Sequence, residues 1–172
     1  MQKDGYTKMF EKILNHKNIE VILDTDYKSI LDSIKFDKMI YTGPIDYFFD
    51  YKFGKLPYRS IRFEFRNLPQ VQYQETAQIN YVDESVEFTR VIEHKLLSQQ
   101  NSDTTTISFE YPQKDGEPYY PVPNEENRNQ YLLYKKETEK FKNVIFCGRL
   151  AEYQYYNMDQ AVANTIKVFE DL

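Results

Sequence analysis

The middle of this chain holds short runs in which apolar and polar residues alternate, with no room for helices between them. Residues 61–66 read IRFEFR, and similar runs cover residues 73–82, 88–95 and 105–111. Alternation with a period of two is typical of strands that are buried on one face. Parallel neighbours need a crossover of a dozen or more residues, so strands this close together predict an antiparallel sheet. We expect the phenylalanines of the first run to face the core.

The first 56 residues have a different pattern, in which helices and strands alternate. Apolar residues at helical spacing predict a helix that starts after Asp4 and ends near residues 15–18. Residues 19–23 alternate like a strand, and residues 38–41 are read as a buried strand. The turn Thr42-Gly43-Pro44 closes that second strand.

The last 29 residues return to this α/β character. A short apolar strand over residues 144–147 runs into Gly148-Arg149, and a loop rich in tyrosine follows. The next helix opens at Asn157-Met158-Asp159, where Gln160 completes the pattern of a capping box. Its buried stripe is predicted at Val162, Ile166 and Phe169.

The chain therefore reads as a mixed α+β fold with two parts. Residues 1–56 and 143–172 are expected to form part of an α/β layer. Residues 57–142 are expected to form an antiparallel sheet domain, covered by a helix over residues 125–141 that Asn124 caps.

Composition excludes several classes of function. The net charge of −5 and the pI near 5.2 leave no overall basic field for nucleic acid, so any phosphate contact needs local arginines. One cysteine, Cys147, provides no disulfide framework and fits a reducing compartment. With no stretch long enough to cross a membrane and no signal peptide, we expect a cytoplasmic protein without nucleic-acid or membrane partners.

The junction at Gly148 has the chemistry of an anion or cofactor site. A strand that leads into a helix presents free backbone N–H groups and the positive end of the helix dipole. Gly148 allows close approach of a ligand to the backbone, and Arg149 adds a cation. The chain has 16 tyrosines, and those of the loop supply stacking faces and hydroxyl groups.

Several sequence strings resemble bacterial UDP-galactopyranose mutase, in order and over nearly the whole chain. They are GYTKMFEKIL, YTGPIDYFFDYKFGKLPYRSIRFE, FTRVIEHK, PYYPVP and GRLAEYQYYNMDQAVA. The resemblance implies the C-terminal portion of such an enzyme, without the glycine-rich FAD fingerprint and the helical substrate domain. It implies interconversion of UDP-galactopyranose and UDP-galactofuranose for cell-surface polysaccharides, in which N5 of the reduced flavin of FAD is the nucleophile and no side chain is catalytic.

The resemblance also implies roles for particular residues. Those matched to contacts with the UDP diphosphate are Arg90, Tyr120 and Tyr155. Those matched to the flavin cofactor are Arg149, Asn157, Met158, Asp159, Thr42 and Gly43. Asn157 stands where some members of the family carry aspartate.

Other polar residues are interpreted as structural. His94 is expected to hydrogen-bond across strands, His16 to lie on the surface, and Cys147 to fill a small space in the core. No spacing of cysteine, histidine or acidic residues indicates a metal site. Two alternatives stay open: a non-catalytic module that binds a nucleotide sugar or carbohydrate, and a chain that is inactive by itself. Exposed edges and apolar patches would also allow a homo-oligomer.

Overall fold

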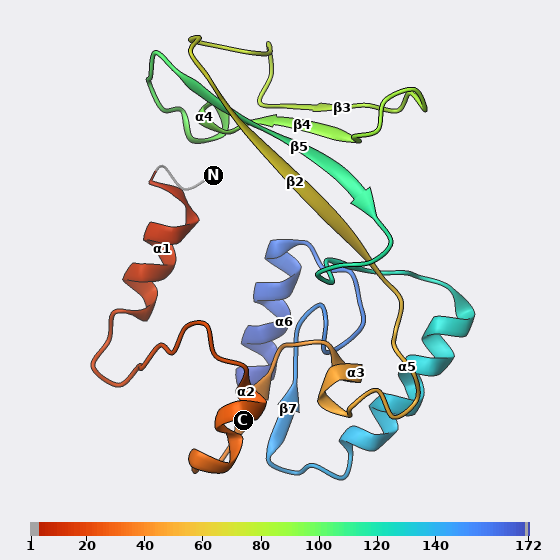
Figure 1. The fold of residues 1–172 in the computed structure, drawn as a ribbon. Coiled ribbons are helices and arrows are strands. Elements are labelled where there is room, and N and C mark those ends of the chain that lie inside the picture. The colour runs from red at the N-terminus through yellow and green to blue at the C-terminus, as the bar shows by residue number, and fades with distance from the viewer. Residues whose placement is uncertain (1–3, 171) are drawn as a thin grey trace. The chain divides into compact units, whose positions relative to one another are not determined.

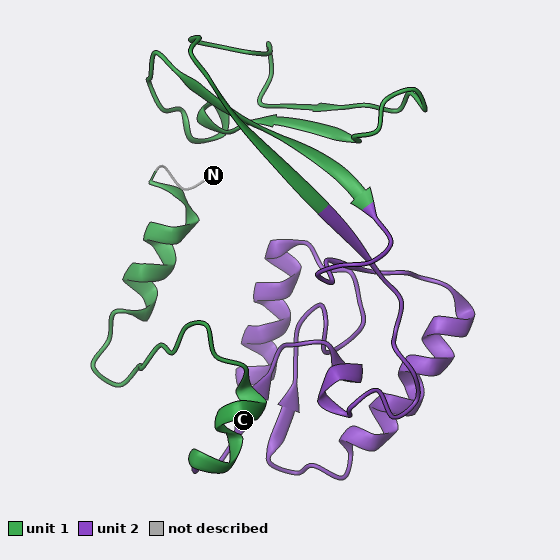
Figure 2. Ribbon diagram, in the orientation of Figure 1, with its two compact units in different colours: residues 1–34, 62–112 green, residues 35–61, 113–172 purple. Residues whose placement is uncertain are grey.

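The computed structural model describes residues 4–170 and 172, which fall into two compact units (Figure 2). The first unit consists of residues 1–34 and 62–112, and the second of residues 35–61 and 113–172. The helix at the start of the chain thus groups with the antiparallel sheet rather than with the α/β part.

Figure 1 names the helices and strands along the chain. The first unit contains α1 (Gly5–Leu14), α2 (Tyr27–Ile30), the 3-10 helix η1 (Leu31–Ser33), most of β2 (Tyr58–Leu68), β3 (Gln78–Asn80), β4 (Arg90–Glu93), α4 (His94–Ser98) and β5 (Thr105–Gln113) up to Pro112. The second contains β1 (Met39–Tyr41), α3 (Ile45–Phe48), the start of β2, β6 (Tyr120–Pro121), α5 (Glu125–Thr138), β7 (Val144–Phe146) and α6 (Met158–Glu170).

The sheet in the middle of the chain is antiparallel, as the short alternating runs predicted. Its strand order is β3-β4-β5-β2-β6. Strand β4 pairs antiparallel with β3 and β5, and Arg90 lies opposite Glu110. The core of the first unit is formed by Val91, Ile107 and Phe109.

The face of strand β2 that carries Arg62 and Arg66, rather than the face that carries its phenylalanines, lies against this core. The guanidinium carbon of Arg62 lies 3.8 Å from the ring centre of Tyr111, and that of Arg66 lies 4.4 Å from Phe109. The prediction that the phenylalanines face inward is wrong, since Phe65 is 63% exposed. Arginine has a long apolar stem and a cation that stacks on aromatic rings, so it can cover a core that a pattern of charges would place in water.

A carboxylate lies at the centre of the first unit. Glu93 is fully buried, and its side chain accepts hydrogen bonds from the backbone N–H groups of Tyr73 and Gln74 and from the hydroxyl of Thr105. These bonds tie the connection between β2 and β3 to the sheet. A buried charge of this kind is tolerated only where hydrogen bonds replace the lost water.

The second unit is built on a two-stranded parallel sheet. Strands β1 and β7 pair along their whole length, from Met39 opposite Val144 to Tyr41 opposite Phe146. The core beside them contains Ile45, Leu56 and Tyr134.

Helix α5 contributes Tyr134 to that core. The tyrosine hydroxyl donates to the carbonyl of Gly54 at 2.6 Å and accepts from the N–H of Phe53 at 3.0 Å. The helix was expected to cover the antiparallel sheet, but its buried face packs inside the second unit. The predicted cap is confirmed, because Asn124 accepts from the N–H of Asn127 at 2.7 Å.

Helix α6 begins where predicted and turns a different face inward. Its half-buried positions are Ala161, Asn164 and Val168. The predicted stripe is wrong: Val162, Ile166 and Phe169 are 59%, 53% and 72% exposed. Hydrogen bonds from Asn164 to Glu152 and between Thr165 and Cys147 fix this orientation.

The strand predicted over residues 19–23 is also wrong. This segment has no regular structure, and Leu23 is 77% exposed. An alternating pattern makes a strand only beside a pairing partner, and no described strand pairs with these residues. Among the residues that the structure describes, no helix has both the length and the apolar character needed to cross a membrane.

Candidate functional site

Three of the residues singled out from the sequence meet in the second unit. The rings of Tyr120 and Tyr155 stack, with their centres 5.6 Å apart and an angle of 28° between their planes. The guanidinium carbon of Arg149 lies 4.9 Å from the ring centre of Tyr155 and 5.5 Å from that of Tyr120. We call these three residues the tyrosine–arginine cluster.

The backbone around the cluster holds its parts in place. Tyr120 lies on β6, which pairs with β2 so that Tyr120 is opposite Arg59. Arg149 donates through Nη1 to the carbonyl of Tyr119 at 3.4 Å and through Nη2 to the carbonyl of Tyr156. One guanidinium therefore fastens β6 to the loop that precedes α6.

Gly148 and Glu152 shape that loop. Gly148 has φ of +94°, a conformation that residues with a side chain seldom adopt, and a Cβ added there would meet no atom within 4 Å. Its N–H donates to Oε2 of Glu152 at 2.8 Å, and Asn164 on α6 donates to the same oxygen at 2.7 Å. The backbone beside Arg149 is thus fixed and open on one side.

The cluster presents hydroxyl groups together with a cation. Tyr155 is 55% exposed, and within residues 4–170 no hydrogen bond uses the hydroxyl of Tyr120 or Tyr155. A phenol held against a guanidinium can donate to an anion that the same cation attracts. This arrangement suits phosphate oxygens.

Arg90, the remaining predicted contact of the diphosphate, lies on β4 in the first unit. Its Nη1 is 3.2 Å from Oε2 of Glu110, and its Nε donates to Oδ1 of Asn80 at 3.1 Å. His94 directly follows β4 and begins α4, so the prediction that it lies on a strand is wrong. Its Nε2 is nevertheless 2.9 Å from the hydroxyl of Ser108 on β5, which gives the expected hydrogen bond to a strand. The arginine is held rigidly on the sheet.

The residues matched to the flavin lie in the second unit, in two places. Asn157, Met158 and Asp159 form the exposed start of α6, where the N–H of Asn157 donates to Oε1 of Gln160 at 2.8 Å. Thr42 and Gly43 follow β1. A Cβ added at Gly43 would lie 2.7 Å from the hydroxyl oxygen of Tyr41, so that ring covers one side of the turn.

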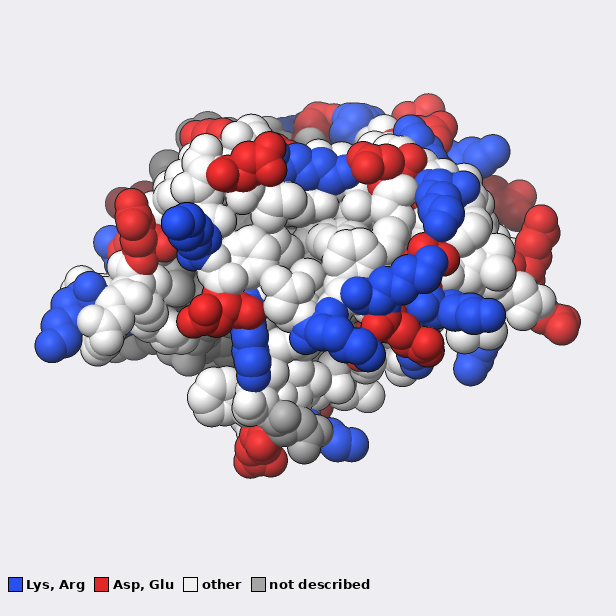
Figure 3. Space-filling model, turned by 90° about the horizontal axis from the view of Figure 1, so that it is seen from below, with Lys and Arg blue, Asp and Glu red and all other residues white. Residues whose placement is uncertain are grey.

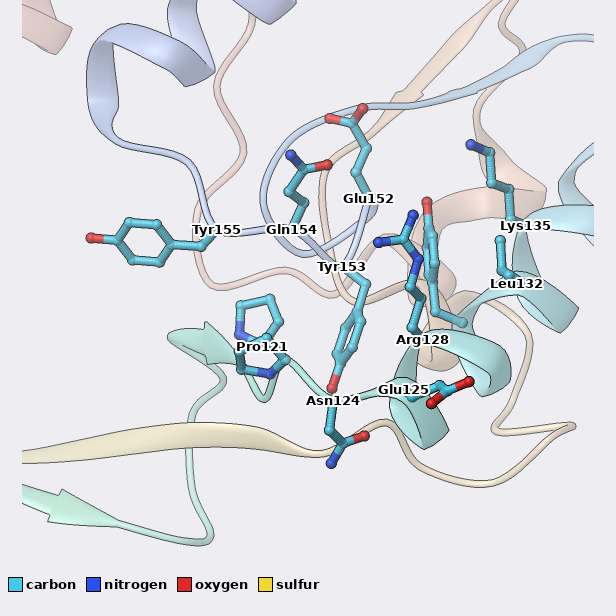
Figure 4. Close-up of a pocket in the computed structure, with 12 residues that line it drawn as sticks. Pro121, Asn124, Glu125, Arg128, Leu132, Lys135, Glu152, Tyr153, Gln154 and Tyr155 are labelled. Carbon is cyan, nitrogen blue, oxygen red and sulfur yellow. The ribbon is translucent and has the colours of Figure 1, made fainter.

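A cavity of about 740 Å³ adjoins the cluster (Figure 4). Its lining comes from the start of α5, the segment before it and the loop at residues 152–155. Arg128, Tyr131 and Lys135 contribute from α5 and were not singled out from the sequence. Their helical spacing within a predicted helix is the signal that could have found them, because it places all three on one side.

Charge elsewhere on the surface is mixed. Figure 3 shows acidic and basic side chains interspersed over the face in view, as a net charge of −5 suggests. No group of three or more potential metal ligands was found among the described residues. Attraction for an anion therefore depends on local cations such as Arg149.

Comparisons with known proteins give one consistent result. The sequence model of the family "UDP-galactopyranose mutase" matches residues 1–155. A "dTDP-fucopyranose mutase" from Escherichia coli is 33% identical over 96% of this chain and 46% of its own length. A "UDP-galactopyranose mutase" from Mycoplasma genitalium is 35% identical over 100% of this chain and 47% of its own length.

A solved structure has a similar fold. A crystal structure of reduced UDP-galactopyranose mutase superimposes with a TM-score of 0.65, over 80% of this chain and 41% of that chain. Their sequence identity is 12%, so this likeness concerns the fold alone. The chain spans about half the length of the curated relatives that it matches.

Proposed function

This chain belongs to the UDP-galactopyranose mutase family, and we propose that it supplies the part that grips the diphosphate of the sugar nucleotide beside a reduced flavin. The observation that carries the proposal is the stacking of Tyr120 and Tyr155 under the guanidinium of Arg149. The reaction would interconvert the pyranose and furanose forms of UDP-galactose.

The proposed roles follow from the geometry of the tyrosine–arginine cluster. The hydroxyls of Tyr120 and Tyr155 would donate to phosphate oxygens, and Arg149 would position both rings while its charge attracts the anion. Negative charge grows on the diphosphate as its bond to the sugar breaks, so donors fixed in advance lower the barrier. Arg90 is proposed as a further contact of the diphosphate on its match to the family alone, since Glu110 and Asn80 already engage its guanidinium in the first unit.

The residues present fit one edge of a flavin. The first turn of α6 is exposed at Asn157, Met158 and Asp159, and the backbone at Gly148 is open on one side. With Arg149, these residues would hold the ring edge, where the end of the helix favours negative charge. Thr42 and Gly43 would lie on the adenosine side. A reduced flavin supplies, when bound, the nucleophile that displaces the diphosphate from the anomeric carbon.

We expect this chain alone to purify colourless and to leave both UDP-sugars unchanged. Its five glycines form no G-x-G-x-x-G sequence, so it has no loop of that type for the FAD diphosphate. The measurement is absorbance in the flavin band together with chromatography of the two sugar nucleotides. The mutase of Mycoplasma genitalium serves as the positive control. A yellow preparation with one FAD per chain would contradict the prediction.

A second candidate substrate is a dTDP-sugar, because the Escherichia coli relative carries the name dTDP-fucopyranose mutase. The proposed contacts reach the diphosphate, which both nucleotides share. We therefore expect UDP and dTDP to bind this chain within about threefold of each other, and UMP at least about tenfold more weakly. Titration calorimetry measures all three. A strong preference for one base would assign the substrate to that nucleotide. An affinity for UMP equal to that for UDP would contradict the proposal that the chain binds the diphosphate.

The remaining alternative is a module that binds a nucleotide sugar without chemistry. Such a module would use the same tyrosine–arginine cluster as the proposed mutase, but it would need no flavin. Activity in the presence of FAD and a reductant, measured on the chain with the same chromatography, would exclude it.

A further inference from the structure

The cavity beside α5 contains two cations that the structure leaves without partners. Arg128 and Lys135 line it, and neither side chain takes part in a hydrogen bond or ion pair with any described residue. Near the C-terminal end of α5, Glu137 pairs with Lys52 and Lys140, at 2.9 Å and 2.8 Å, and Lys136 lies outside the lining. Arg128 and Lys135 are therefore the cations of α5 that face the cavity.

The spacing of these cations suits an elongated anion. Arg128 and Lys135 are two turns apart on α5, roughly 10 Å along the helix axis. Tyr131 lies between them on the same side of the helix. Burial, and then the charge of Glu152, raises the pKa of Tyr131 to about 12, so its hydroxyl stays protonated and can donate. Three donors thus lie in a row along one wall.

Within the described residues, neither acidic residue of the lining forms an ion pair with these cations. Oε2 of Glu152 accepts from the N–H of Gly148 and from Asn164, and Glu152 keeps its negative charge. Figure 4 shows the carboxylate of Glu125 turned away from the guanidinium of Arg128. Glu125 lies in the first turn of α5, where its negative charge interacts favourably with the positive end of the helix dipole.

Apolar surface lies beside these donors. Leu132 provides it from α5, and Pro121, Pro123 and Tyr153 provide it from the segment before α5 and from the loop at residues 152–155. The cavity volume of about 740 Å³ is typical of sites for small molecules. We propose that this cavity, which meets the tyrosine–arginine cluster at Tyr155, is a second binding site, for an organic diphosphate whose two phosphates contact Arg128 and Lys135. The apolar wall would receive the organic group.

Inorganic pyrophosphate is the probe that tests the cation row. Titration calorimetry on the full chain compares the native sequence, the double variant Arg128→Gln/Lys135→Gln and the control Lys136→Gln. Lys136 is exposed on the same helix and lies outside the lining. We expect the double variant to lose at least about tenfold in affinity and the control to stay within about twofold.

The variant Tyr120→Phe separates this site from the cluster, because it removes a hydroxyl of the cluster, and Tyr120 does not line the cavity. If the cavity is the site, Tyr120→Phe keeps pyrophosphate binding, and the backbone amide signals of residues 128, 131 and 135 shift in NMR spectra when pyrophosphate is added. Native-like binding by the double variant would overturn the proposal, as would loss of binding in Tyr120→Phe alone. A failure of UDP to bind the cluster would leave these outcomes unchanged, so the two proposals fail separately.

Discussion

Replacing Glu93 with alanine is expected to destabilise the first unit by about 3–5 kcal/mol. The carboxylate is fully buried and accepts from two backbone N–H groups and from the hydroxyl of Thr105 at 2.6 Å. Its removal leaves these donors without partners inside the protein, and each such group costs about 1–3 kcal/mol. A cavity would add to the loss.

Urea unfolding gives the overall loss of stability for this variant, and hydrogen exchange at the amides of Tyr73 and Gln74 locates it. Glu84→Ala is the matched control, because Glu84 is an exposed acidic residue of the same unit. Equal stability of Glu93→Ala and Glu84→Ala would show that the carboxylate does not hold the β2–β3 connection.

The same carboxylate makes stability depend on pH. Burial alone would raise the pKa of Glu93, but the hydrogen bonds from Thr105, Gln74 and Tyr73 and the charge of Lys95 outweigh burial and bring the pKa below its ordinary value of 4.5. A lowered pKa in the folded state gives stability that is present above the pKa of the unfolded state. That stability is lost as the pH falls through the folded value. The difference in the free energy of unfolding between the native chain and Glu93→Gln should therefore become smaller as the pH falls through the folded-state pKa of Glu93.

Replacing Arg149 with glutamine is expected to abolish detectable UDP binding by the tyrosine–arginine cluster. The guanidinium holds the carbonyls of Tyr119 and Tyr156, so its loss releases the rings as well as the charge. Hydrogen bonds that involve a charged group contribute about 1.5–3 kcal/mol each, which corresponds to roughly 10- to 150-fold in affinity per bond. This chain spans about half the length of the curated relatives that it matches, so we expect it to bind UDP weakly and the remaining affinity of the variant to fall below detection.

Phosphorus NMR of UDP measures this effect. The background variant Arg128→Gln/Lys135→Gln removes the second proposed diphosphate site from the measurement. Tyr155→Phe keeps the stack and removes one hydroxyl that donates to a charged phosphate, so it should cost about 1.5–3 kcal/mol of binding free energy. Lys142→Gln, an exposed change in the same unit, should have no effect. Native-like binding by Arg149→Gln would contradict the assigned role, and submicromolar binding by the native chain would contradict the expected weakness.

The antiparallel pairing of the middle strands could be predicted from the sequence, but the strand order and the faces of the elements could not. The short spacing between the alternating runs excludes crossovers and leaves only antiparallel pairing. The facing of β2 depends on what lies opposite: Arg62 and Arg66 cover Tyr111 and Phe109. The facing of α6 likewise depends on polar contacts of Asn164 and Thr165, which a hydrophobic pattern does not record.

Part of the candidate site could be predicted as well. The glycine, arginine and tyrosines before α6 indicated an anion site, and Arg149 does lie against the stacked rings of Tyr120 and Tyr155. Anion binding there stays a prediction. The contact between Tyr120 and the loop before α6 was not predicted from neighbouring residues in the sequence. The pairing of β6 with β2 brings Tyr120 to that loop, and a sequence pattern does not show this pairing. The row of cations on α5 was not predicted, because charged residues on a helix usually indicate a face in contact with water.

A crystal structure of this chain with UDP tests the central claim most directly. We expect diphosphate oxygens within hydrogen-bonding distance of the hydroxyls of Tyr120 and Tyr155, with the guanidinium of Arg149 against both rings. The account is contradicted if UDP binds elsewhere, for example with its phosphates at Arg128 and Lys135, while both tyrosine hydroxyls face solvent.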